Sequence, residues 1–405
     1  MCGIFGVTGD SSTTELLIRG LKRMEYRGYD SSGICLVNGK QLIRKRAVGP
    51  LSNLEPLVEN LPDSECGIAH TRWATHGAPT QENAHPHFST DSKIAVVHNG
   101  IIENEVELRK KIKSIDDGIN FQSETDSELV AHLLSIEFKN FKVDIKTAKE
   151  DEILSCWKSV LDTLEGSFAL AVVIESRKDF ILFARKFAPL IISHDGERGI
   201  LASDVSCVVG LTENVFYLNE GDWGILTNSE AQIFNIDGDL VETEPKKLEW
   251  KLGEAELGGY PTFMLKEIYD QPDIAKYWLE KYLIKNSKTG RYQINYSFDT
   301  KFFESIERIE IVACGTSRHA AMVGKFLLEQ FSGITTNVFF ASEFRYSPPP
   351  LLPNTLTIGV TQSGETADTI AAIDMEIKRR SIIENEKFKP NLIAITNRKE
   401  SSIGR

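Results

Sequence analysis

The sequence has no long hydrophobic run, no excess of basic residues and no secretory leader pattern. Although 41% of its 405 residues are hydrophobic, no stretch approaches the roughly 18 continuous apolar residues of a membrane-spanning helix. The opening MCGIFGVTGD lacks the basic start and long apolar segment of a signal peptide. Lys and Arg number 46 against 58 Asp and Glu, giving a formal net charge of -12 without a basic block. These absences argue against nucleic acid and against membrane surfaces as partners.

Paired cysteines are also absent. The six cysteines are scattered without a CxxC pair, at Cys2, Cys35, Cys66, Cys156, Cys207 and Cys314. This spacing argues against a disulfide framework and a zinc ribbon, and it favours a cytoplasmic location. Several histidines between positions 70 and 98 leave a metal site open as an alternative, but no HxxxH pair accompanies them. We therefore expect no metal and no cofactor.

The apolar pattern divides the chain into two parts. Up to about residue 235, short apolar and β-branched runs predict strands at 3–7, 33–37, 94–97, 168–174 and 180–184, with helices at 12–24 and 128–138. From residue 309, predicted strands (309–313, 335–340, 355–360, 391–396) alternate with helices (317–331, 366–379), which is typical of a doubly wound α/β sheet. The domains predicted are 1–240, a charged linker 241–262, and 263–405, whose first helix Pro272 should disturb.

Cys2 is the first candidate for a catalytic nucleophile. Removal of Met1 would make it the first residue, with an α-amine that titrates near pH 7.7–8.0. That amine can accept the thiol proton of its own residue, so one amino acid would supply nucleophile and base. A second-position cysteine without a role is the alternative, and the cysteine alone does not decide between them.

Four motifs accompany Cys2: YRGYDSSG at 26–33, HTRWATHG at 70–77, HNG at 98–100 and SETDSE at 123–128. With CGIFG, they resemble the glutamine amidotransferases of the N-terminal-nucleophile class. The first two are similar, more specifically, to the glutamine–fructose-6-phosphate aminotransferase family. The resemblance implies an α+β N-terminal-nucleophile hydrolase fold of four αββα layers.

Residue chemistry fits a glutamine pocket. Arg72 offers a planar fork for the substrate carboxylate, and Asp126 a negative charge for its ammonium. Asn99, through its amide, and Gly100, through its backbone N–H, suit a developing oxyanion. The resemblance adds Thr75 and His76 to this pocket. A surface ion pair for Arg72 and a helix N-cap for Asp126 stay open as alternatives.

The resemblance gives two further residues, Arg27 and Trp73, roles in stabilising the intermediate and in a mobile gate. Ordinary core packing is the alternative for Trp73.

Two later loops, CGTS at 314–317 and TQSGETADT at 361–369, each join a predicted strand to a helix. Hydroxyls and backbone N–H groups at helix N-termini suit a phosphate, whereas helix capping is the alternative. Neither GxGxxG nor a Walker lysine is present. The second loop resembles the phosphosugar-binding loop of the SIS (sugar isomerase) family. That resemblance implies fructose 6-phosphate binding by Thr316, Ser317, Thr361, Gln362, Ser363 and Thr366.

Together, the resemblances imply transfer of the glutamine amide nitrogen to fructose 6-phosphate, giving glucosamine 6-phosphate for hexosamine synthesis. Family members continue beyond the position of Arg405 and supply there the lysine, glutamate and histidine that act on the sugar. We therefore expect a complete glutaminase domain, an incomplete SIS-type domain, and a homodimer or association with a C-terminal half. Glutaminase activity alone, a non-catalytic phosphosugar-binding or regulatory subunit, and another amidotransferase remain alternatives.

Overall fold

The computed structural model describes residues 2–25, 28–74, 77–248, 259–285, 290–294, 301–397 and 401–404. Contacts divide the chain into two compact units, Met1–Lys266 and Glu267–Arg405. The predicted linker includes residues 249–258, which lie outside the described residues, so the domain bounds stay a prediction. None of the helices described is long and apolar enough to cross a membrane.

The first unit contains two large sheets. One has eight strands in the order β14-β11-β9-β10-β1-β4-β2-β3, and the other has six in the order β13-β12-β8-β7-β6-β5. Strands of the first sheet are β1 (Gly3–Thr8), β2 (Ser31–Asn38), β3 (Gln41–Val48), β4 (Cys66–Arg72), β9 (Ile191–His194), β10 (Gly199–Ala202), β11 (Asn214–Tyr217) and β14 (Lys246–Lys247). Those of the second are β5 (His87–Phe88), β6 (Ile94–Ile102), β7 (Gly166–Ile174), β8 (Arg177–Lys186), β12 (Trp223–Leu226) and β13 (Ala231–Phe234).

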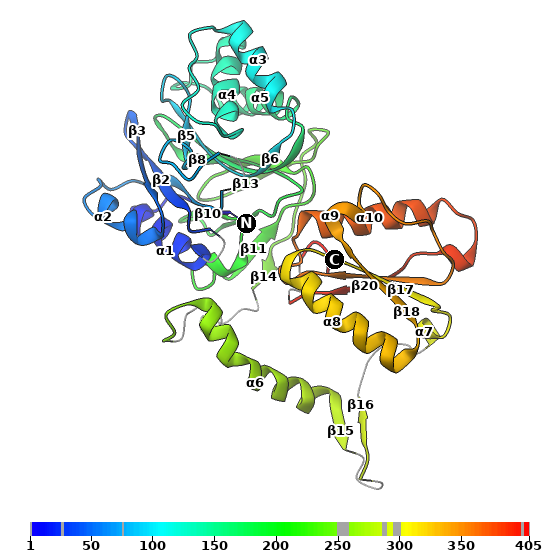
Figure 1. The fold of residues 1–405 in the computed structure, drawn as a ribbon. Coiled ribbons are helices and arrows are strands. Elements are labelled where there is room, and N and C mark those ends of the chain that lie inside the picture. The colour runs from blue at the N-terminus through cyan, green and yellow to red at the C-terminus, as the bar shows by residue number, and fades with distance from the viewer. Residues whose placement is uncertain are drawn as a thin grey trace. The chain divides into compact units, whose positions relative to one another are not determined.

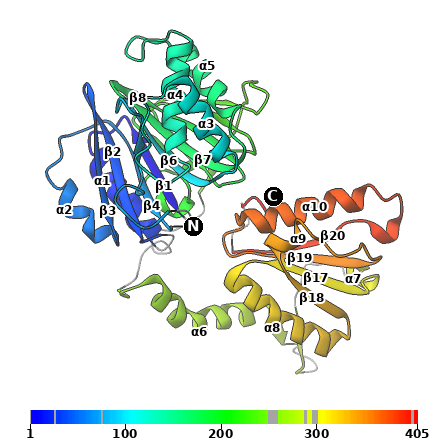
Figure 2. The same cartoon turned by 45° about the horizontal axis from the view of Figure 1, so that its top comes forward.

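Helices cover the outer face of each sheet (Figures 1 and 2). On the first sheet lie α1 (Thr13–Met24) and the short α2 (Glu55–Val58), and on the second α3 (Glu105–Ile115), α4 (Glu128–Asn140) and α5 (Glu150–Leu161). One buried apolar cluster joins the helices to each sheet, and a third fills the space between the sheets. This layering is αββα and confirms the first fold class predicted.

The second unit is built on a four-stranded parallel sheet in the order β18-β17-β19-β20. Its strands are β17 (Arg308–Ala313), β18 (Thr335–Phe340), β19 (Thr355–Val360) and β20 (Asn391–Ile395), with helices α7 (Lys301–Glu304), α8 (Gly315–Ser332), α9 (Ala341–Phe344) and α10 (Ala367–Ser381). This confirms the doubly wound α/β class. β17 and β19 lie side by side with Ala313 opposite Val360, so the loops that follow them meet at the switch point of the sheet.

A helix and a small hairpin precede this sheet. The helix is α6 (Phe263–Tyr282), and β15 (Leu283–Lys285) pairs with β16 (Tyr292–Ile294). Pro272, expected to disturb this helix, lies inside α6 and does not end it. Proline removes one backbone donor, and the hydrogen bonds of neighbouring turns carry the helix past it.

Candidate active site

Strand pairing brings Cys2 to the end of two neighbouring strands. Gly3 of β1 lies opposite Thr71 of β4, which places Cys2 beside the segment that follows β4. The backbone N–H of Trp73 donates to Cys2 Sγ at 3.3 Å, and Sγ lies 3.6 Å from the Trp73 carbonyl oxygen. A donor aimed at the sulfur favours negative charge there, as a nucleophilic thiolate needs.

The Asn99 amide is fixed by two contacts at its opposite ends. Its Nδ2 donates to the Cys2 carbonyl oxygen at 3.1 Å, and its Oδ1 accepts from Nε2 of His70 at 3.0 Å. His70 Nε2 also lies 3.0 Å from the His98 carbonyl oxygen, and burial lowers the pKa of His70 to about 3. The ring is therefore neutral with its proton on Nε2, and it turns the amide N–H groups of Asn99 toward Cys2. His70 was not predicted as a site residue, although it opens the HTRWATHG motif.

Gly100 follows on β6 with a backbone φ of +131°. A Cβ at this position would lie 2.0 Å from the carbonyl oxygen of Ser167 on β7. Only glycine fits both the angle and the space.

The Asp126 carboxylate faces the site instead of capping a helix. Its Oδ2 accepts from the backbone N–H of Ile102 at 2.7 Å, and Ser127 Oγ donates to its Oδ1 at 3.2 Å. Burial would raise the pKa of Asp126, but the neighbouring His98 and these hydrogen bonds hold it well below its usual range. Asp126 is therefore a carboxylate near neutral pH, ready to attract an ammonium group.

Arg72 is buried, so the surface ion-pair alternative does not describe it. Its guanidinium donates to the carbonyl oxygens of Gly77 and Ala78, each at 3.2 Å. Burial lowers the pKa of Arg72, while the nearby Cys2 and acidic groups oppose that shift. The guanidinium remains charged at neutral pH, so its positive charge acts on Cys2.

Trp73 is not a core residue. Its side chain is 42% exposed, and the ring of Tyr29 meets it edge to face with centroids 5.5 Å apart. Exposure beside Cys2 is compatible with the predicted gate.

Several of these side chains border one small cavity of about 30 Å³ next to Cys2. It is lined by Cys2, Arg72, Trp73, His85, His98, Gly100, Thr125, Asp126 and Ser127. Arg27, Thr75 and His76 were also predicted for this pocket, but they lie outside the described residues. Thr125 and Ser127 belong to the SETDSE motif, which could have indicated them; no signal pointed to His85 as a lining residue.

A second group of predicted residues gathers at the switch point of the parallel sheet. The hydroxyls of Thr361 and Thr366 lie 2.7 Å apart, and Ser363 Oγ accepts the backbone N–H of Glu365 at 3.1 Å. Thr366 is the N-cap residue of α10 but makes no capping hydrogen bond with its side chain. The capping alternative therefore does not account for its hydroxyl.

The remaining residues of the predicted sugar site differ in exposure. Thr316 and Ser317 start α8, and Thr316 is exposed, as is Gln362, whereas Thr361 and Ser363 are buried. The turn around Gly364, at φ +69°, packs on residue 401, and Glu365 accepts the backbone N–H of Ser402 at 2.8 Å. These contacts hold the 361–366 loop in place.

No metal site emerges in the part of the chain that the structure describes, where no group of three His, Cys, Asp or Glu side chains is arranged to hold an ion.

Comparisons with known proteins agree with the two units. Residues 70–210 match the glutamine amidotransferase domain, and residues 302–405 match the SIS domain. A relative from Thermosynechococcus vestitus, named glutamine--fructose-6-phosphate aminotransferase [isomerizing], is 42% identical over 407 residues, covering 100% of this chain and 64% of that protein. A protein of the same name from Nostoc sp. is 43% identical over 404 residues, covering 100% of this chain and 63% of that protein. The chain thus spans less than two thirds of their length.

Solved structures that match part of the chain include a glutamine phosphoribosylpyrophosphate amidotransferase from B. subtilis. It has a TM-score of 0.45 at 16% identity and covers 88% of this chain and 75% of its own. The C-terminal domain of glucosamine-fructose-6-phosphate aminotransferase from Francisella tularensis has a TM-score of 0.31 at 30% identity, covering 36% of this chain and 38% of its own.

Proposed function

We propose that this chain, a relative of the glutamine–fructose-6-phosphate aminotransferases along its whole length, hydrolyses glutamine at Cys2 to glutamate and ammonia. The observation that carries the proposal is the geometry around Cys2. Its sulfur lies beside a backbone donor, its carbonyl accepts from Asn99, and its cavity includes Arg72, Gly100 and Asp126.

The reaction follows from these groups. After Met1 is removed, the α-amine of Cys2 takes the thiol proton, and the sulfur attacks the side-chain amide carbon of glutamine. The carbonyl oxygen becomes an oxyanion, held by the Asn99 amide and the Gly100 N–H. The proton then passes from the amine to the amide nitrogen, the C–N bond breaks, and ammonia leaves a γ-glutamyl thioester on Cys2. Water adds to the thioester, releases glutamate and returns the proton to sulfur.

Substrate orientation depends on charge. Asp126 would bind the α-ammonium of glutamine, and the Arg72 guanidinium the α-carboxylate, with Thr75 and His76 completing the pocket. Arg27 and Trp73 would stabilise the intermediate and restrict the exit of ammonia.

The second unit would bind fructose 6-phosphate as the acceptor of the nitrogen. Its hydroxyl-rich loop lies where ligands of doubly wound sheets bind, and it comprises Thr361, Gln362, Ser363 and Thr366, with Thr316 and Ser317 on the neighbouring loop. Formation of glucosamine 6-phosphate, as in the relatives' names, is proposed for the whole protein.

Glutaminase activity alone is the second candidate function, because every described group around Cys2 belongs to the first unit. Dimerisation, a separate C-terminal half and a cytoplasmic location remain predictions.

The test compares glutamate release by the wild type, Cys2→Ala and Cys314→Ala. Cys314 is the control, because its thiol lies in the second unit and is partly exposed. We expect wild-type rates from Cys314→Ala and no release above background from Cys2→Ala. Equal release by wild type and Cys2→Ala would refute the proposal.

A further inference from the structure

A second cavity of the first unit, of about 310 Å³, lies outside the Cys2 site. It is bordered by β3 and β5, which are the edge strands of the two sheets, and by the start of α4. The volume falls in the range of pockets that hold small metabolites, from about 300 Å³ upward. Its lining includes Arg44, Arg46, His87, Phe88 and Ser92.

Neither arginine forms an ion pair within the described residues, although the charge of Glu128 acts on both and that of Glu82 acts on Arg46. Arg44 and Arg46 are two residues apart in β3, so both side chains lie on the same face of the strand. Arg44 donates to the carbonyl oxygen of Pro86 at 3.3 Å, and Arg46 to those of Glu82 and Ala84 at 3.0 and 2.8 Å. Among the described residues, no carboxylate lies within ion-pair distance of either guanidinium. Each keeps N–H donors beyond those used on backbone carbonyls.

Both arginines are half-buried, and this partial burial makes their charge costly. Burial lowers the pKa of Arg44, and burial together with repulsion by Arg44 lowers the pKa of Arg46 to about 10. Such shifts show that removing the charged groups from water is not fully compensated by nearby anions. A bound anion would supply that compensation.

One carboxylate, Glu128, does line the cavity. Its oxygens are already occupied by the backbone N–H groups of Gln122 and Ser123, by the Ser123 hydroxyl and by His132. These hydrogen bonds help lower the pKa of Glu128 to about 2, against the effect of burial. Among the lining residues, two guanidinium groups face one carboxylate whose oxygens are already hydrogen-bonded, so the lining carries a net positive charge. Glu82, whose charge also acts on Arg46, is exposed and lies outside the lining.

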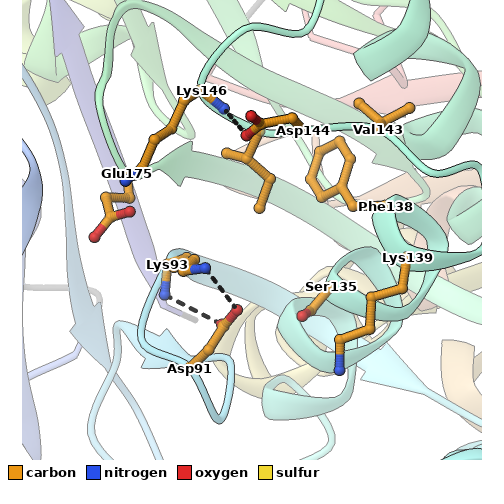
Figure 3. Close-up of a pocket in the computed structure, with 10 residues that line it drawn as sticks. Asp91, Lys93, Ser135, Phe138, Lys139, Val143, Asp144, Lys146 and Glu175 are labelled. Carbon is orange, nitrogen blue, oxygen red and sulfur yellow. Dashed lines mark hydrogen bonds and ion pairs between the residues drawn. The ribbon is translucent and has the colours of Figure 1, made fainter.

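The pocket of Figure 3 provides a contrast. It also contains basic side chains, and two of its lysines have acidic neighbours. Lys93 Nζ lies 3.9 Å from Asp91, and Lys139 Nζ lies 3.4 Å from Asp116. Both lysines are also at least partly exposed to solvent. Basic residues with acidic partners give no reason to expect an anion there.

We propose that the cavity between β3, β5 and α4 binds a phosphate monoester or inorganic phosphate through Arg44 and Arg46. Paired guanidinium forks match the oxygens of a phosphate group. Phe88, covered by the Arg44 guanidinium at 4.1 Å from its ring centroid, gives the cavity an apolar wall beside them. This site is separate from the proposed sugar-binding loop and does not depend on the proposed glutaminase activity.

A hydrogen bond connects this cavity to the Cys2 site. His87, which lines the cavity, lies 3.1 Å through Nε2 from the hydroxyl of Thr125, and Thr125 lines the cavity around Cys2. The two cavities therefore share a hydrogen-bonded pair of lining residues.

The test is calorimetric titration of the whole chain with inorganic phosphate and, separately, with glucose 6-phosphate. We expect saturable phosphate binding that weakens by about tenfold or more in Arg44→Gln/Arg46→Gln, because charge-assisted bonds are lost. Lys139→Gln, in the pocket of Figure 3, and Ser363→Ala, in the second unit, should retain it. Glucose 6-phosphate binding that is lost in the same double variant would assign the phosphate to a sugar; binding of phosphate alone would assign it to the free ion.

Ser92→Asp is the second variant, because Ser92 is exposed at the cavity and tolerates an aspartate at its φ of +57°. The added carboxylate should weaken phosphate binding without altering either arginine. Absence of wild-type binding, undiminished binding by a folded Arg44→Gln/Arg46→Gln protein, or loss only in Ser363→Ala would overturn the proposal.

Discussion

At the scale of single residues, three buried histidines near Cys2, His70, His85 and His87, pack their rings against one another. The His70 and His85 rings stack with centroids 4.1 Å apart, and His87 meets His85 edge to face at 4.5 Å. Both ring nitrogens of His85 lack a hydrogen-bond partner within the described ranges. The stack depends on neutral rings, because a proton on any of them would place a charge in a buried site near Arg72.

This dependence gives a prediction for acid stability. Burial lowers the pKa of His70 to about 3 and that of His85 and His87 well below the usual range. The unfolded chain takes up protons near pH 6.5, before the folded chain does, so stability is full above that pH and falls below it. Each histidine removes up to about 1.4 kcal/mol of unfolding free energy per pH unit.

His85→Phe keeps an aromatic ring and removes the titration. We expect its unfolding free energy to fall less steeply between pH 6 and pH 5 by about 1.4 kcal/mol per pH unit, as measured by urea unfolding. His319→Phe, at an exposed position of the second unit, is the control and should retain the wild-type slope. A wild-type slope in His85→Phe would show that this ring is already protonated in the folded chain.

Among the elements, β6 shapes the site through one glycine. Gly100→Ala would combine a left-handed φ with a clash against the Ser167 carbonyl of β7. We expect a loss of about 1–3 kcal/mol from backbone strain alone, more from displaced pairing with β7, and loss of glutamate release.

Gly39→Ala is the matched control, because Gly39 has a φ of +56° with nothing within 4 Å of an added Cβ. It should cost about 1 kcal/mol and leave activity intact. Chemical unfolding and glutamate assays of both variants measure the difference, and equal losses would mean that contact with Ser167 does not matter.

The strands also show which elements the apolar pattern of the sequence can predict. Buried strands with continuous apolar runs, such as β1, β7 and β17, were predicted close to their observed bounds because apolar length identifies them. Only the apolar centre of β8 was predicted. β3 was missed: its sequence QLIRKRAV places charges on an edge strand that is only half buried. The cavity with Arg44 and Arg46 could not be foreseen without that strand.

For the whole molecule, the two compact units predict separable functions. Ser363→Ala removes an acceptor from the hydroxyl-rich loop after β19, so we expect weaker binding of fructose 6-phosphate by calorimetry and unchanged glutamate release. Ser381→Ala, at the end of α10, is the control for serine loss and should alter neither. Reduced glutamate release in Ser363→Ala without fructose 6-phosphate would contradict this separation.

The residues that the motifs predicted for the glutamine pocket include several that the fold brings together. Arg72, Trp73, Gly100 and Asp126, which come from three separate segments, line one cavity with Cys2. These residues lie close together because of strand pairings, such as Gly3 opposite Thr71, that no local sequence pattern specifies. His70 and His85 escaped prediction for the same reason, since their contacts with Asn99 and with each other arise only in the folded sheets.

The proposed reaction requires Cys2 to carry the γ-glutamyl group. The most direct measurement is mass spectrometry of the N-terminal peptide after the protein is mixed with glutamine and quenched in acid. We expect a peptide that begins at Cys2, without Met1, and bears a γ-glutamyl thioester that is absent from Cys2→Ala. A peptide that retains Met1, or an adduct on another cysteine, would contradict it.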